Sequence, residues 1–154
     1  MSTLFVDTIN EKTSGNGIYI PGHVLQIVEA EYSTQTDVAS GDYADLGVAV
    51  TITPKSSSSK ILVVTNVHCY VNGAGLCGVR VMRGSTEVVE ASRALGYSDN
   101  SSTVASLTKL DAPSTTSATT YKIQVNHLAI SQGTTIRINQ QNGGSRITVM
   151  EIGA

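Results

Sequence analysis

The sequence predicts an all-β protein, an antiparallel two-sheet sandwich of jelly-roll type with an extended N-terminal arm. Apolar and polar residues alternate at period two in most of its apolar stretches, which is typical of half-buried strands. Short clusters of Gly, Pro, Asn and Ser separate these stretches, as turns do. No stretch shows a long helical pattern with caps, and we count about nine strands, which suits a sandwich.

The clearest pair of strands lies at 46–52 and 61–69, joined by a serine-rich connection. The first strand ends before Pro54, which has no N–H to donate to a sheet. Ser56–Ser59 follow, and we expect them to be a polar connector rather than a modification site. The residues predicted to line the inward faces of this pair are Leu46, Val48, Val50, Ile52, Ile61, Val63, Val67 and Cys69.

We expect residues 1–22 to form an N-terminal arm and residues 23–154 to form the sandwich, or head domain. The arm combines a β-prone run at 2–9 with a short strand at 18–20, which ends at a Pro-Gly turn. It holds little apolar material and therefore needs another surface to lie on, unless it is a first edge strand of the sandwich. Its candidate attachment or oligomerisation residues are Leu4, Phe5, Val6, Ile9, Ile18 and Ile20.

Within the head, alternation and turn residues predict the remaining elements in order. The segment 23–32 fits a strand or a helix by spacing, and its β-branched residues favour a strand. Two long polar loops are expected, at 33–45 and 92–102. Asn72–Gly75 has the chemistry of a hairpin turn. The further strands are expected at 76–82, 86–91, 103–110, 119–128, 134–140 and 146–152.

Composition narrows the class of protein. A chain of 154 residues suits one domain with an ordinary apolar core. Charged residues are only 14%, and 18 serines and 18 threonines supply much of the polar surface, which suits a β-rich structural protein. The net charge of −2, without a basic block, argues against nucleic-acid binding. There is no Trp and only one Phe, so we expect further burial between subunits.

No targeting segment is recognisable in the sequence. The N-terminal residues lack the pattern of a signal peptide, and no apolar stretch is long enough to span a membrane. We therefore expect synthesis in a cytoplasm and no membrane insertion.

The residues that could carry catalysis form no recognisable motif. His23, His68 and His127 lie in no metal-binding or nucleophile-base pattern, and the carboxylates are scattered. We expect a protein that is not an enzyme and that has no cofactor and no metal. His68 and His127 could meet across strands or at a three-fold axis and hold a metal or anion, but hydrogen-bonded or solvent-facing histidines are favoured. Cys69 and Cys77 bracket the expected hairpin and could form a cross-strand bridge, but two buried thiols are favoured.

Tyrosines in polar loops are the best candidates for binding. Sugar rings stack on aromatic faces while Asp and Asn bond to their hydroxyls, and loops carry binding more often than strands do. The alternative to a carbohydrate-binding role is a structural role at the sheet rims, and it applies to each of Tyr32, Tyr43, Tyr70 and Tyr97. The candidate receptor-contact residues of the two loops are Asp42, Tyr43, Tyr97, Asp99 and Asn100.

Several segments together resemble a known group of proteins. TLFVDTI and IPGHVLQIV are similar to segments of tail-fibre-like structural proteins of bacteriophages, including those of marine and cyanobacterial hosts. TPKSSSSKILV, VMRGST, LDAPSTTSATTYKIQV and ITVMEIGA resemble recurring elements of the β-sandwich head of the same group. The resemblance implies a virion protein made in the host bacterial cytoplasm, usually a homotrimer, with an arm that binds other virion proteins and a C-terminal knob.

Three function classes follow from these observations. The first is a trimeric fibre or spike subunit whose knob contacts host-surface carbohydrate. The second is a capsid decoration protein that stabilises the shell. The third is a non-viral lectin-like or adhesion module.

Overall fold

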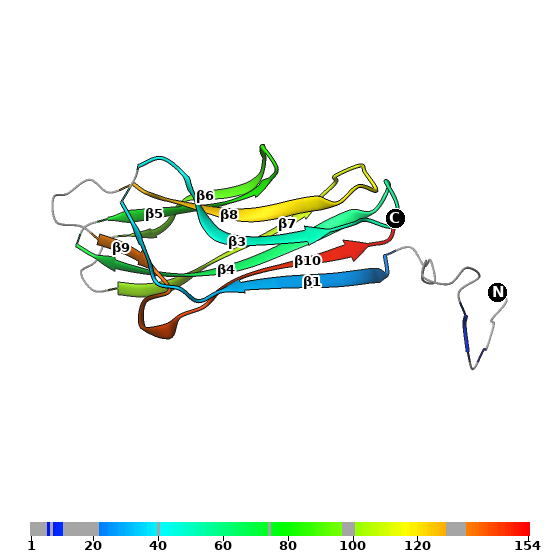
Figure 1. The fold of residues 1–154 in the computed structure, drawn as a ribbon, viewed down its shortest axis with the longest axis horizontal. Helices are drawn as coiled ribbons and strands as arrows, with labels where there is room; N and C mark the ends of the chain where they lie inside the picture. The colour runs from blue at the N-terminus through cyan, green and yellow to red at the C-terminus, as the bar shows by residue number, and fades with distance from the viewer. Residues whose placement is uncertain are drawn as a thin grey trace, which may run out of the picture.

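The computed structural model describes residues 6, 8–10, 22–39, 41–73, 75–96, 101–128 and 135–154. These residues form ten β-strands in two antiparallel sheets that pack face to face (Figure 1). The prediction of an all-β, two-sheet sandwich is therefore confirmed. Within the described ranges, no helix is long and apolar enough to cross a membrane.

The two sheets differ in size. Sheet A contains β1 (Val24–Tyr32), β2 (Thr36–Val38), β4 (Lys60–Asn72), β7 (Ser101–Asp111), β9 (Thr135–Ile138) and β10 (Ser145–Ile152). Sheet B contains β3 (Ala44–Ile52), β5 (Leu76–Arg83), β6 (Thr86–Gly96) and β8 (Thr119–His127). A short 3₁₀ turn, η1 (Gln140–Asn142), lies between β9 and β10. The segment 23–32, which fitted both periods, is a strand, as expected.

The strand order is that of a jelly roll. β1 pairs with β10, β2 pairs with β9, and β4 pairs with both β10 and β9. β1 and β2 therefore form one long strand with a break in it, and so do β9 and β10. We call each of these broken strands, and each unbroken strand, a line. If each line counts as one strand, sheet A places the first line beside the last, followed by the third and the sixth. Sheet B holds the second, seventh, fourth and fifth. This arrangement is two interlocked Greek keys.

The core lies between the sheets and is built mainly from Val and Ile. The alternation predicted for the central strands is confirmed, because every inward residue named for 46–52 and 61–69 is buried. β8 follows the same pattern with Tyr121, Ile123 and Val125. Tyr121 is the one aromatic residue among the buried core residues of the described chain, which agrees with a core made of small side chains.

The expected hairpin at Asn72–Gly75 is wrong. β4 lies in sheet A and β5 in sheet B, so the connection crosses from one sheet to the other. Turn residues permit the chain to reverse, but they do not decide whether the flanking strands pair or face each other across a core. Cys69 and Cys77 consequently meet across the sandwich, with 3.8 Å between their Sγ atoms, and both are free and buried. The favoured interpretation of Cys69 and Cys77 as two buried thiols is confirmed. The expectation that they lie opposite each other on two paired strands is wrong, because β4 and β5 belong to different sheets.

The two long loops are shorter than expected. Residues 33–45 contain β2, and β3 begins at Ala44. In the segment 92–102, β6 continues to Gly96 and β7 begins at Ser101. β6 continues because Leu76 and Cys77 of β5 pair with Gly96 and Leu95. Partner strands far away in sequence thus extend β-structure into polar segments that show little alternation of their own.

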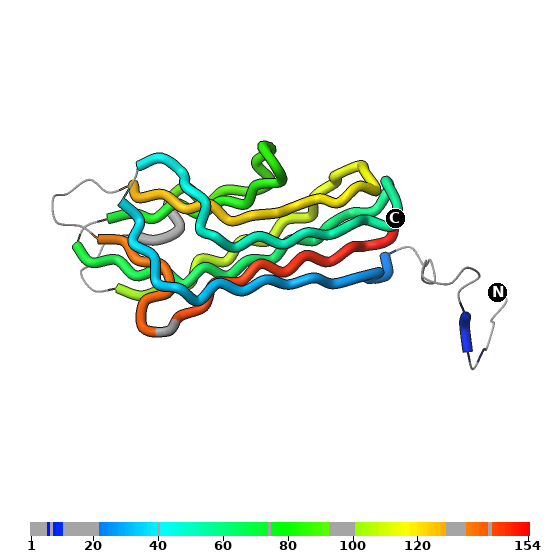
Figure 2. The backbone as a smooth tube through the Cα atoms, in the orientation of Figure 1, coloured from blue at the N-terminus to red at the C-terminus, as the bar shows by residue number. Residues whose placement is uncertain are grey.

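A buried polar node holds the interruption between β9 and β10 together. Asn66 of β4 pairs with Arg146, and Cys69, three residues later on β4, pairs with Ile138. Ile138 and Arg146 are eight residues apart, so the β9–β10 line holds more residues than β4 does over this stretch. The extra residues form an excursion, drawn in orange in Figure 2. Asn139 begins it in the left-handed conformation, with φ of 58°. Its contacts are a backbone N–H bond to the His68 carbonyl, an Nδ2 bond to the Tyr32 carbonyl at 2.7 Å, and an Oδ1 that accepts from the Ser145 hydroxyl at 2.7 Å.

Two further polar clusters fix the end of the sandwich near the arm. The Tyr121 hydroxyl donates to Asp111 at 2.8 Å, and Arg83 lies 2.8 Å from the same carboxylate oxygen, so β7 of sheet A is joined to β8 and β5 of sheet B. Glu151 is fully buried and accepts hydrogen bonds from the backbone N–H of Lys55 and from Gln26. The serine-rich connection is thereby tied to β10 and β1.

The sandwich has two distinct ends (Figures 1 and 2). At one end, Gly22 leads into β1 and donates its N–H to the Gly153 carbonyl, so the start of the head lies beside the C-terminus. At the opposite end β2, β4, β6 and β8 end, and β3, β5, β7 and β9 begin. We call these the arm end and the loop end.

Candidate functional site

The candidate receptor-contact residues belong to two connections, β2–β3 and β6–β7. Asp42 and Tyr43 lie between β2 and β3, where the Gly41 carbonyl accepts a hydrogen bond from Asn126 at 3.3 Å. Tyr97, Asp99 and Asn100 lie outside the described residues. Their flanking strands end at the same end of the sandwich, because Gly96 pairs with Leu76, whose carbonyl accepts from Leu128 at 2.8 Å. The fold therefore brings the strand ends that carry both connections to one side of the molecule.

Tyr43 lies flat on the outer face of sheet B. Its hydroxyl donates to Glu90 of β6 at 2.7 Å, and the Arg80 guanidinium lies 4.1 Å from the centre of its ring. Gly78 makes room for this position, since a Cβ there would be 2.5 Å from the Tyr43 hydroxyl. Burial, together with the Glu90 carboxylate, raises the pKa of Tyr43 well above its usual range, so the hydroxyl remains a donor. One face of the ring is covered by Arg80.

A hydrogen-bonded row of polar side chains crosses sheet B beside Tyr43. Arg80 Nε donates to Gln124 at 2.8 Å, and Gln124 Nε2 donates to Asp45 at 2.7 Å. Lys122 reaches the other oxygen of Asp45 at 2.8 Å, and Arg80 also pairs with Glu87 at 3.2 Å. The hydrogen bonds from Lys122 and Gln124 lower the pKa of Asp45. The charges on this row are paired with one another, which suits surface contact rather than proton transfer.

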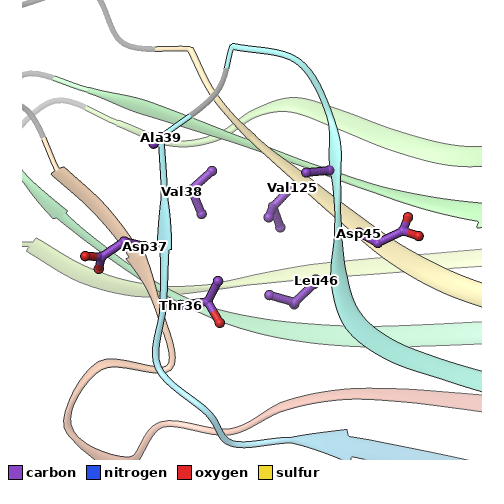
Figure 3. A pocket seen from close by; sticks show the side chains of 8 residues that line it. Thr36, Asp37, Val38, Ala39, Asp45, Leu46 and Val125 are labelled. Atoms are coloured by element: carbon purple, nitrogen blue, oxygen red, sulfur yellow. The ribbon is translucent and has the colours of Figure 1, made fainter.

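A small apolar pocket opens between β2 and β3, the edge strands of the two sheets (Figure 3). Its volume is about 180 Å³, below the range of cavities that hold drug-sized ligands. The side chains of Val38, Leu46 and Val125 point into it, whereas the carboxylates of Asp37 and Asp45 point away. Asp37 is paired with Arg137 at 3.0 Å. The pocket has room for one small apolar group.

The histidines are not brought together. His68 lies on the outer face of sheet A against Gly143, where a Cβ would be 2.2 Å from His68 Nδ1, whereas His127 ends β8 in sheet B. His23 is exposed next to β1. No group of three or more His, Cys, Asp or Glu residues within the described ranges could hold a metal ion. The described histidines thus lie apart on the two sheets and beside β1.

The arm residues are described only in part. Val6 and Ile9 are exposed. Leu4, Phe5, Ile18 and Ile20 lie outside the described residues.

Sequence reasoning missed the partners of Tyr43. Arg80 and Glu90 sit on β5 and β6 and are distant from Tyr43 in the sequence. The available signal was Arg80 between the apolar Val79 and Val81, which predicts an outward arginine in a strand. Alternation does not show which segments of the chain lie beside this strand, so the contact between Arg80 and Tyr43 could not be predicted.

Comparisons with known proteins give only a likeness of shape. No protein-family model matches the sequence, and no curated protein matches it. Similar solved structures include infectious bursal disease virus of the Gx strain, at 10% identity and a TM-score of 0.47, and of the Gt strain, at 12% and 0.47. A crystal structure of a subviral particle of that virus is similar at 12% identity and a TM-score of 0.42. These matches cover 84–85% of this chain but only 37–39% of the others, and we draw no conclusion about function from them.

Proposed function

We propose that this protein is a non-enzymatic structural subunit of a bacteriophage virion, a trimeric fibre or spike subunit whose β-sandwich head contacts the host surface. Residues 1–22 attach the subunit to other virion proteins, and residues 23–154 form the head. The observation that carries the proposal is the arrangement of the two ends. β2 and β6 end, and β3 and β7 begin, at the end of the sandwich opposite to Gly22 and the C-terminus (Figure 1).

Two further observations support this proposal. Segments throughout the chain, from TLFVDTI to ITVMEIGA, resemble those of phage tail-fibre-like proteins. The jelly roll occurs in viral coat and lectin domains, both of which bind through their surfaces, although a fold by itself does not fix a function.

The mechanism is multivalent contact. Tyr43 and the neighbouring polar row present hydrogen-bonding groups on sheet B, and Tyr97, Asp99 and Asn100 follow β6 in the sequence, a strand that ends at the same end of the sandwich. A single site of this kind binds carbohydrate weakly. Three sites on one knob, with several knobs on a particle, multiply the affinity without any tight individual contact.

The test uses soluble full-length protein and host cells. The wild type is expected to bind the cells and to block infection. The Tyr43→Ala/Tyr97→Ala double variant is expected to lose at least about 10-fold in affinity for the cells. Thr116→Ala is the matched control, because Thr116 is exposed in the β7–β8 connection at the arm end. Circular dichroism confirms that each variant is folded. Wild-type binding by the double variant would remove the host-contact proposal.

A second candidate function, capsid decoration, is favoured by one observation. Ile27 and Leu110 are large apolar residues exposed on the outer face of sheet A, and a flat apolar face can pack on a shell. Gel densitometry of purified particles separates the two functions. A decoration protein would match the major shell protein in copy number and raise the temperature at which the shell breaks, whereas a fibre subunit would be far scarcer and leave that temperature unchanged.

A further inference from the structure

The outer face of sheet A carries an apolar row across all four of its lines at the arm end. The register places Ile27 of β1 opposite Met150 of β10, Met150 opposite Leu62 of β4, and Leu62 opposite Leu110 of β7. Residues directly opposite each other in antiparallel strands share a face, so these four side chains form one continuous row. Ile27 is 59% exposed and Leu110 53% exposed. Val24 and Ile152 extend the row toward the arm.

The next two rows of this face carry several polar side chains. In the next row Thr148 donates to Glu29 at 2.7 Å, and in the row after it Arg146 pairs with Glu31 at 3.0 Å. Further along the same row, Ser106 donates to Asn66 at 2.7 Å. The polar groups there satisfy one another, whereas Ile27 and Leu110 in the apolar row are left exposed by the described residues. The outer face of sheet B carries the hydrogen-bonded side chains of Arg80, Gln124 and Asp45 instead.

The N-terminal arm also exposes apolar side chains. Val6 and Ile9 are 52% and 56% exposed, so the arm does not bury them against its own head. Twenty-one residues precede Gly22, and fully extended they reach up to about 70 Å. They join the head at the arm end, beside the row, because Gly22 is bonded to Gly153. A second copy satisfies both exposed surfaces at once.

We propose that the apolar row of one subunit binds the N-terminal arm of a second copy of this chain. The row alone is too small for a stable pairing of two sheet faces. Four strands at about 4.8 Å spacing are about 19 Å wide, and two outward residues along each strand span about 14 Å, so the area is on the order of 300 Å². A stable interface buries roughly 800 Å² per partner. An exchanged arm adds the missing area. Each subunit gives one arm and receives one, a head-to-tail contact that closes into a ring. This inference rests on the proposed oligomeric subunit and identifies its interface.

The first experiment measures self-association of the full-length protein by sedimentation. Leu110→Glu and Ile27→Glu on the row, and Ile9→Glu on the arm, are each expected to weaken association about 100-fold or more. The matched controls are Val104→Glu, on the same strand and face with 52% exposure but outside the row, and Thr8→Glu, next to Ile9 on the arm. Both controls are expected to associate like the wild type.

The second experiment asks whose arm lies on the row. Ile9→Cys and Leu110→Cys chains are made separately, mixed and oxidised, and a disulfide-linked heterodimer is expected, whereas the chain carrying both substitutions should form linked oligomers rather than an internal bridge. The native Cys69 and Cys77 are buried, and the wild type serves as their control.

Three results would overturn the inference. They are a wild type that stays monomeric at high concentration, an Ile9→Glu variant that associates normally while Leu110→Glu does not, and an internal bridge in the doubly substituted chain. None of them decides whether the chain is a virion component, which mass spectrometry of purified particles tests separately.

Discussion

His127 shows how one side chain links the fold to pH. It ends β8 with Nε2 buried and without a hydrogen-bond partner among the described residues. Burial lowers the pKa of this imidazole, and a hydrogen bond to the backbone of Val38 opposes the effect only in part. The folded protein therefore holds His127 neutral at pH values at which the unfolded chain begins to protonate it.

The sign of the pH dependence follows from this lowered pKa. Below about pH 6.5 the unfolded chain binds a proton that the folded chain does not, so the free energy of unfolding falls as the pH drops toward the folded pKa. Calorimetric melting between pH 7.5 and 5 is expected to show a shallower loss of stability for His127→Gln than for the wild type. His23→Gln, which removes an exposed imidazole, is the control for the loss of a histidine. Equal slopes for His127→Gln and the wild type would contradict the assignment.

At the scale of elements, the β9–β10 interruption depends on Asn139. Its amide satisfies the Tyr32 carbonyl and the Ser145 hydroxyl in a dry environment, and its backbone adopts a positive φ that Asn tolerates better than Ala does. β4 keeps sheet A continuous across this interruption, because it pairs with both β10 and β9, and the Asn139 side chain joins the excursion to β1 and β10.

Two substitutions separate these contributions. Asn139→Ala removes the hydrogen bonds and also strains the backbone, so we expect it to lower the free energy of unfolding by about 2–4 kcal/mol. Asn139→Gly removes the same hydrogen bonds without the strain, and it should be about 1 kcal/mol more stable than the Ala variant. Urea unfolding measures both values. If Asn139→Ala is as stable as the wild type, the node does not hold the excursion.

The elements also show what the sequence could and could not predict. Period-two alternation identified the inward residues of β3, β4 and β8, because burial of one sheet face imposes that period directly. It did not assign strands to sheets, since a strand that pairs with its neighbour and one that crosses the sandwich alternate in the same way. The same limit applied to the candidate site, where Asp42 and Tyr43 were named from loop chemistry but the partner Arg80 was not.

At the scale of the whole molecule, the two sheets are held by apolar packing and by the Asp111 cluster. Asp111 binds the Tyr121 hydroxyl and the Arg83 guanidinium, so one carboxylate from sheet A serves two strands of sheet B. Burial, with a further contribution from Asp111, raises the pKa of Tyr121 above its usual range and keeps its hydroxyl protonated.

A comparison of two Asp–Arg pairs tests this view. Asp111→Ala is expected to cost about 2–3 kcal/mol, because it leaves a buried tyrosine hydroxyl and a partly buried arginine without their acceptor. Asp37→Ala removes an exposed pair with Arg137 and should cost less than about 1 kcal/mol. Denaturant unfolding of both variants gives the difference, and similar losses would mean that the cluster does not join the sheets.

The cysteine pair has a consequence for following the sandwich in solution. Cys69 and Cys77 come from opposite sheets and both are fully buried, and the raised pKa of Cys69 makes its thiol a poor nucleophile while the protein is closed. A thiol reagent can reach them only when the sheets part. The rate at which a thiol reagent labels the wild-type protein therefore reports how often the two sheets separate.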